Sequence, residues 1–254
     1  MSRIEQSYEV GEGCEVVVTL AAADVTVVEG AGGTIEVVLD GSDRALDLID
    51  VYQDGDVVTI RSHKGGRRWN LRQVDVRIVA PVGVALTAKT AAGDLRVSVP
   101  VSDAEIDSAS GDVRLASFDG RCRVKTASGD VTIGQSSGGL RMASASGDLR
   151  LEGFEGDMTV TTASGDVEVG DVRGSVALRT ASGDVVIRQF RGVRLKASSM
   201  SGDFRIWLAA GMTIDADIQT LSGDFRNSVT PSSEEKTISA ELRLKTLSGD
   251  ITLH

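Results

Sequence analysis

Residues 127–169 read ASGDVTIGQSSGGLRMASASGDLRLEGFEGDMTVTTASGDVEV and decide the fold. The tripeptide Ser-Gly-Asp recurs in this stretch every 18 residues, with its glycine at Gly129, Gly147 and Gly165. Another glycine stands midway between each pair, so a glycine recurs every nine residues. A fixed internal period of this size is typical of a protein built from stacked structural repeats.

The same glycine recurs on both sides of this stretch. The 18-residue step runs without a gap from Gly93 to Gly183, and later glycines follow at Gly202, Gly223 and Gly249 with longer steps. Glycine is favoured in turns because it adopts positive φ at low cost, so each of these positions is predicted to be a turn.

Between the glycines, apolar and polar residues alternate. Val131 and Ile133 flank Thr132, and Leu149 and Leu151 flank Arg150. A period of two indicates a strand with one buried face. We expect a small inward residue in one arm of each repeat and a large or variable one in the other, with a phenylalanine in every second repeat and Ser136 and Val172 between. The large set is Phe118, Phe154 and Phe190, and the small set is Ala109, Ala127, Ala145, Ala163 and Ala181.

The repeat predicts an all-β fold, a right-handed parallel β-solenoid of the β-helix or β-roll kind with 18-residue coils. Residues 81–254 are expected to form the solenoid, and residues 1–80, which lack the glycine period, a less regular N-terminal β cap. The polar run at residues 230–236 predicts an inserted surface loop. The last coil, Asp250 to His254, is expected to leave an open edge that allows self-association.

The composition limits the function. The net charge is −10, so binding to nucleic acid is not expected. No apolar run is long enough to span a membrane, which predicts a cytoplasmic protein as given, or a cell-envelope protein if a leader or anchor precedes the sequence. The two cysteines, Cys14 and Cys122, are far apart and match no metal-binding spacing, so no disulfide is expected and Cys122 is expected in the core.

An aspartate follows each turn glycine and forms the most regular polar feature. In stacked coils, Asp112, Asp130, Asp148, Asp166 and Asp184 would form a column of carboxylates. The favoured interpretation is that they accept hydrogen bonds from turn amides. A ladder of Ca²⁺ ions between successive turns is the alternative, although the sequence lacks the G-G-x-G-x-D pattern of the calcium β-roll. No other cofactor is predicted.

A basic segment is a second candidate site, for an anion or a partner. It carries five cationic or titratable side chains around one tryptophan, and an acidic glycan or a phosphate could bind such a patch. Its members are Arg61, His63, Lys64, Arg67, Arg68 and Trp69.

Catalytic constellations are not found in the sequence. It holds only two histidines, His63 and His254, and no Walker loop, H-E-x-x-H or C-x-x-C motif. The aspartates repeat uniformly, whereas an active site would break the repeat in one place. We therefore expect a protein that is not an enzyme.

The run VDVRIVAPVGVALTAKTAAGDLRV at residues 74–97, followed by T-A-S-G-D-V units, resembles the DUF4097 family of bacterial proteins, which are labelled as adhesins. The resemblance covers about residues 74–254. It implies a repeat β fold and an adhesive role, and it supplies no catalytic residues.

Three functions compete at this point. The favoured one is a structural, adhesin-like interaction module that presents its repeat faces to a protein or glycan partner. The alternatives are a self-assembling scaffold resembling bactofilin filaments and a carbohydrate-active β-helix enzyme.

Overall fold

The computed structural model describes residues 2–63, 74–229 and 238–254. Within these residues the protein is all-β, with the four-residue helix α1 (Asp43–Leu46) as the single helix. None of the described helical structure is long and apolar enough to cross a membrane. The chain divides into two compact units, Met1–Asp130 and Val131–His254. The loop expected at residues 230–236 lies outside the described residues.

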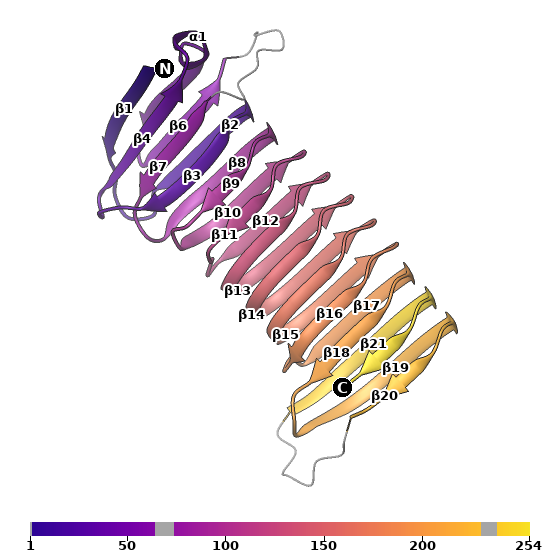
Figure 1. Ribbon diagram of the computed structural model, residues 1–254. Helices are drawn as coiled ribbons and strands as arrows, with labels where there is room; N and C mark the ends of the chain where they lie inside the picture. Colours follow the sequence, from indigo (N-terminus) through magenta and orange to yellow (C-terminus); the bar gives the residue numbers. More distant parts are fainter. Residues whose placement is uncertain (1, 64–73, 230–237) are drawn as a thin grey trace. The chain divides into compact units, whose positions relative to one another are not determined.

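The described residues of the first unit form twelve strands (Figure 1). They are β1 (Ser2–Glu9), β2 (Glu15–Ala22), β3 (Asp24–Glu29), β4 (Thr34–Gly41), β5 (Ile49–Asp54), β6 (Val57–Ser62), β7 (Asp75–Ala80), β8 (Val84–Ala92), β9 (Leu95–Val97), β10 (Val101–Ser108), β11 (Val113–Leu115) and β12 (Arg121–Thr126).

Parallel pairing dominates the later part of this unit. β8 pairs with β2 and β10, and β10 pairs with β12. The offset is 18 residues where the sequence period is regular, since Ala104 lies opposite both Leu86 and Cys122. A second row of parallel strands runs from β3 through β9 to β11. The two arms of each repeat thus lie in two different rows of strands.

Antiparallel strands occur at the start of the chain. β4 pairs antiparallel with β1 and β7, and β5 pairs antiparallel with β6. β2 and β3, in contrast, pair in parallel with β8 and β9, which follow residue 80. A division of the chain at residue 80 stays a prediction.

Where the structure describes the second unit, at residues 131–229 and 238–254, it has ten strands. They are β13 (Val131–Ser144), β14 (Leu149–Thr162), β15 (Val167–Thr180), β16 (Val185–Phe190), β17 (Arg194–Ser201), β18 (Phe204–Leu208), β19 (Met212–Ser222), β20 (Phe225–Asn227), β21 (Ile238–Ser248) and β22 (Ile251–Leu253).

In this unit β13, β14 and β15 are 14-residue strands that pair in parallel along their length. Val131 lies opposite Leu149, and Leu149 opposite Val167, so the offset equals the 18-residue sequence period. The apolar residues of neighbouring strands are therefore in register, and their side chains contact one another along the inner face of the sheet.

The chain end does not form the edge of the second unit. β21 lies between β17 and β19, and β22 lies between β18 and β20. The expectation of an open edge at Asp250 to His254 is therefore wrong, because both neighbours of β22 hydrogen-bond to it. Among the described residues the last strands of the unit are β19 and β20, whose apolar side chains Ile214, Ile218 and Phe225 are only partly buried or exposed.

The core confirms the expected large inward residues and corrects the small ones. Phe118, Phe154 and Phe190 are buried. Ala127 and Ala163, expected inside, are exposed. The inward residue of that arm is a hydroxyl residue one position earlier, such as Thr162, whose Oγ1 accepts the N–H of Gly165 at 3.0 Å. Thr162 continues the alternation of the buried residues Met158 and Val160, so Ala163 faces outward.

Gly93, the first turn glycine of the series, has a positive φ of 118°, but later turn glycines are required for a different reason. Gly165 has no positive φ, but a Cβ built on it would lie 2.1 Å from the carbonyl oxygen of Gly147 in the preceding coil. A Cβ on Gly183 would meet the oxygen of Gly165 at 2.2 Å. Positive φ is found instead at the midway glycines Gly156 and Gly174. The turns are thus stacked too closely for any side chain.

Candidate functional site

The aspartate column hydrogen-bonds to the backbone of neighbouring coils. In the first unit the N–H of Asp130 donates to Asp112 Oδ1 at 3.2 Å. In the second, the N–H of Asp166 donates to Asp148 Oδ1 at 2.9 Å, and that of Asp184 to Asp166 Oδ1 at 2.8 Å. One carboxylate oxygen per coil thus holds the next turn in register, as the turn-amide interpretation predicts.

In several repeats the other carboxylate oxygen of the column faces arginine. Arg114 lies 3.3 Å from Asp112 Oδ2, and Arg205 lies 3.1 Å from Asp203 Oδ2 and 3.8 Å from Asp184 Oδ2. These guanidinium groups offset the repulsion between stacked carboxylates. In the described part of the chain, no three His, Cys, Asp or Glu side chains are grouped so as to hold a metal ion. The calcium ladder stays a prediction.

Two members of the predicted basic segment lie close together at the end of β6. The Arg61 guanidinium stacks over the Tyr52 ring at 5.0 Å, and His63 Nε2 lies 2.8 Å from Asp50 Oδ1. Arg61 Nε also lies 3.6 Å from Asp50, so this carboxylate offsets part of the positive charge. The remaining members, Lys64, Arg67, Arg68 and Trp69, lie outside the described residues.

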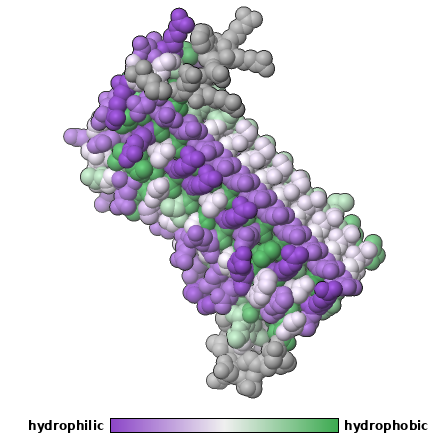
Figure 2. Space-filling view, in the orientation of Figure 1, coloured by the Kyte–Doolittle hydropathy of each residue, from purple (hydrophilic) through white to green (hydrophobic). Residues whose placement is uncertain are grey.

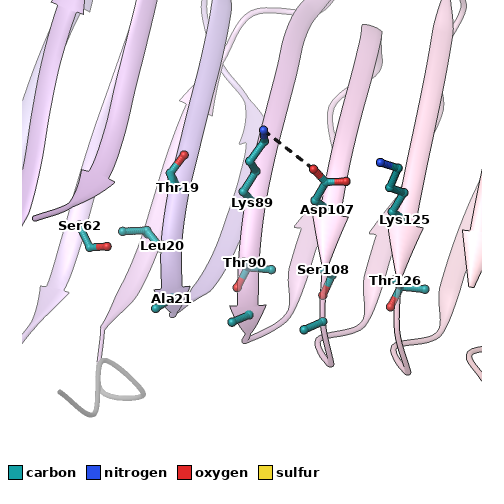
Figure 3. A pocket seen from close by; sticks show the side chains of 12 residues that line it. Thr19, Leu20, Ala21, Ser62, Lys89, Thr90, Asp107, Ser108, Lys125 and Thr126 are labelled. Carbon is teal, nitrogen blue, oxygen red and sulfur yellow. Dashed lines mark ion pairs between the residues drawn. The ribbon is translucent and has the colours of Figure 1, made fainter. Parts of the chain in front are cut away.

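A shallow groove of about 480 Å³ crosses β8, β10 and β12 of the first unit (Figure 3). Lys89, Asp107 and Lys125 lie along it, one from each strand, and Lys89 Nζ is 3.9 Å from Asp107 Oδ2. Alternating signs on neighbouring strands stabilise a sheet. With two lysines and one aspartate, the lining carries a small net positive charge.

The equivalent outward rows of the second unit hold more cationic side chains. Lys196 of β17 and Asp217 of β19 lie opposite Arg243 of β21, one on each side. The next row contains Arg179 of β15, Ser198, Lys245 and Gln219. All four cationic side chains are exposed. Like charges on directly opposite residues destabilise a sheet. We call these four residues, Arg179, Lys196, Arg243 and Lys245, the cationic face.

Two carboxylates lie beside the cationic face, Asp217 opposite Arg243 and Glu241 on β21 itself. Glu241 lies 3.1 Å from Arg194 Nε and 2.5 Å from Arg243 Nη2. The hydrogen bond from Arg194, followed by the charge of Arg243, lowers the pKa of Glu241. Within the described residues, Arg179, Lys196 and Lys245 have no acidic side chain within ion-pair distance. The face thus has a net positive charge on a chain whose net charge is −10.

A row of exposed apolar side chains borders the cationic face. Met200, Leu247 and Leu221 are 60%, 51% and 82% exposed. The register of β17, β21 and β19 places them side by side, each two residues before a turn glycine. We call these three residues the apolar ridge. The equivalent residue in the earlier coils of this unit is alanine, at Ala145, Ala163 and Ala181.

Sequence reasoning missed both features. The change from alanine to Met or Leu two residues before the turn glycine was a readable signal for the ridge. The cationic face had no such signal, because Lys196 and Arg243 are 47 residues apart and become neighbours only when β21 pairs with β17.

The parallel repeat, the stacked glycines and the aspartate column together define a family. The family model of Toastrack DUF4097 matches residues 14–254, and the chain belongs to this family. No curated protein matches the chain.

Among solved structures, the chain is similar to a “putative adhesin” from Bacteroides fragilis, at 14% identity and a TM-score of 0.50, covering 100% of this chain and 97% of that one. It is also similar to a “putative adhesin” from Parabacteroides merdae, at 9% identity and a TM-score of 0.44, covering 99% and 96%. A “putative lipid binding protein” from Parabacteroides distasonis matches at 14% identity and a TM-score of 0.47, covering 99% and 96%. The first similarity shows a shared fold alone, and the other two are too distant to support an argument.

Proposed function

We propose that the protein is a non-enzymatic, adhesin-like interaction module. Its scaffold is a right-handed parallel β-solenoid with 18-residue coils. The parallel pairing of β13, β14 and β15 at an offset of 18 residues supports the coil length. The strong preference of parallel crossover connections for one hand supports the handedness. Such a scaffold presents flat, regular outward faces to a partner.

The binding surface in this proposal is the cationic face, and the partner is acidic. The observation that carries the proposal is the pairing of Lys196 with Arg243 beside the row of Arg179 and Lys245. Unbalanced like charges on neighbouring strands cost stability, and an acidic partner offsets that cost. A glycan rich in uronic acids has the required charge, and its carboxylates suit bidentate arginine contacts.

The absence of catalysis is part of the proposal. The aspartates that could serve as acid and base repeat in every coil and are engaged with backbone amides and arginines. The two histidines are also occupied, since His63 lies 2.8 Å from Asp50 and His254 stacks on Trp207 at 4.5 Å.

The test is binding of a polyuronate to the full chain, followed by calorimetry at two salt concentrations. We expect binding that weakens as salt rises, and a loss of at least tenfold in the double variant Lys196→Glu, Lys245→Glu. The matched control is Arg44→Glu, Arg77→Glu, which makes the same charge change at exposed sites in the first unit. Absence of binding, or an equal loss in the control, overturns the proposal.

Self-association is the second candidate function, and one observation favours it. An apolar groove of about 470 Å³ lies along β19 and β20, lined by Ile214, Ile218 and Phe225 among others. These strands, rather than Asp250 to His254, would form the contact. Sedimentation of the full chain tests this candidate. A concentration-dependent dimer that Ile218→Asp abolishes supports it, and a monomer at about 200 µM, where even weak interfaces assemble, contradicts it.

A further inference from the structure

The apolar ridge has no structural role that the fold requires. The same position is alanine in the three preceding coils of the second unit, so the turn forms without a large side chain there. Leu221 is 82% exposed, and Met200 and Leu247 are more than half exposed. Figure 2 shows hydrophobic surface at the edge where β17, β19 and β21 end. Contiguous exposed apolar side chains mark a surface that contacts another apolar phase or molecule.

The ridge and the cationic face lie on the same side of one sheet. Side chains two residues apart along a strand project to the same side, about 6.8 Å from each other. Lys245 and Leu247 of β21 are related in this way, and so, two steps apart, are Lys196 and Met200 of β17. Opposite Lys245 and one row from the ridge lies Ser198, which is partly buried and uncharged. The apolar row therefore lies at the strand ends. Directly behind it lie Ser198, Lys245 and Gln219, and the row behind these contains Lys196, Arg243 and Asp217.

We propose that this surface docks onto an anionic lipid membrane. In this arrangement Met200, Leu221 and Leu247 enter the boundary between headgroups and acyl chains, while Lys196 and Lys245 contact the headgroups. A surface with apolar side chains at its rim and basic side chains behind them is the combination that peripheral membrane proteins use. The inference rests on the proposed function, since it names the acidic partner of the same cationic face.

The apolar ridge distinguishes a lipid surface from an acidic glycan. A glycan chain satisfies the cations but leaves the three large side chains in water. A lipid surface satisfies both, because apolar side chains gain free energy on leaving water while basic ones gain from the surface potential. Binding assays with soluble polyuronate and with lipid vesicles therefore distinguish the contribution of the cationic face from that of the apolar ridge.

The experiment measures sedimentation of the full chain with vesicles of phosphatidylcholine alone or with 30% phosphatidylglycerol. The test variant is Met200→Ala, Leu221→Ala, Leu247→Ala, which restores the alanine that other coils carry and so preserves the turn. The control is Val82→Ala, at a residue that is 57% exposed in the first unit. We expect the wild type and the control to bind the anionic vesicles and the triple variant to bind at least tenfold more weakly.

Polyuronate binding of the same variants completes the test. We expect the triple variant to bind polyuronate as the wild type does. The double variant Lys196→Glu, Lys245→Glu should bind neither polyuronate nor anionic vesicles. Polyuronate binding without vesicle binding overturns the membrane inference and leaves the proposed function standing. Equal vesicle binding by the triple variant, or equal binding to neutral vesicles, also overturns the inference. If the wild type binds neither ligand, both proposals fail.

Discussion

The substitution Gly165→Ala tests the stacking of the turns directly. Its new Cβ would lie 2.1 Å from the carbonyl oxygen of Gly147 and 3.1 Å from Thr162 Oγ1. Ordinary contacts between a methyl carbon and an oxygen are more than 1 Å longer than the first of these distances. The two coils must therefore separate locally, which strains the hydrogen bonds between the Gly165 and Gly147 turns. Overpacking of this kind costs about 3 kcal/mol.

The assay is thermal and urea unfolding followed by circular dichroism. A loss of about 3 kcal/mol corresponds to a fall in Tm of about 6–12 °C for a chain of this size. Gly32→Ala is the matched control, because a Cβ there meets no atom within 4 Å and the residue has no positive φ. We expect the control to change stability by less than about 0.5 kcal/mol. Equal stability of Gly165→Ala and Gly32→Ala would refute the close stacking.

Three further predictions follow from the core and the turns. Phe154→Ala should cost about 3–5 kcal/mol of unfolding free energy because the ring is buried, whereas Thr159→Ala on the outer face should be neutral in the same urea titration. Cys14 and Cys122 should react with a thiol reagent at pH 8 only after denaturation, since both are buried and burial raises the pKa of Cys122 to about 12. Millimolar CaCl₂ should not raise Tm relative to EDTA, because column aspartates already accept turn amides and several also pair with arginines; a rise of several degrees would establish the calcium ladder.

The regular part of the fold could be predicted from the sequence, because there the 18-residue sequence period equals the offset between paired strands. Glycine every nine residues and alternating apolar residues predicted strands, turns and the buried Phe154 column. The small inward residue was predicted at the wrong position. Ala163 was expected inside because it stands two residues before its glycine, as Phe154 does before Gly156. The alternation of Met158, Val160 and Thr162 instead places Thr162 inside, where its hydroxyl caps Gly165.

In the C-terminal part of the chain, the order of strands in the sheet differs from their order in the sequence. β21 follows β19 along the chain, yet it pairs with β17 on its other side. Nothing in the local pattern marks this insertion, because Leu242 and Leu244 alternate like the apolar residues of any other coil. The expected open edge at Asp250 was therefore placed on the wrong strand.

By itself, the sequence determined the all-β class, the 18-residue period and the column of aspartates, because these depend on local turn chemistry and on strand periodicity. Only the tertiary structure decided which surfaces the repeat creates. The cationic face and the apolar ridge each join residues from strands far apart in the chain, such as Met200 and Leu247. Such a surface depends on the order in which coils stack, and that order is fixed by pairing between distant segments rather than by any one of them.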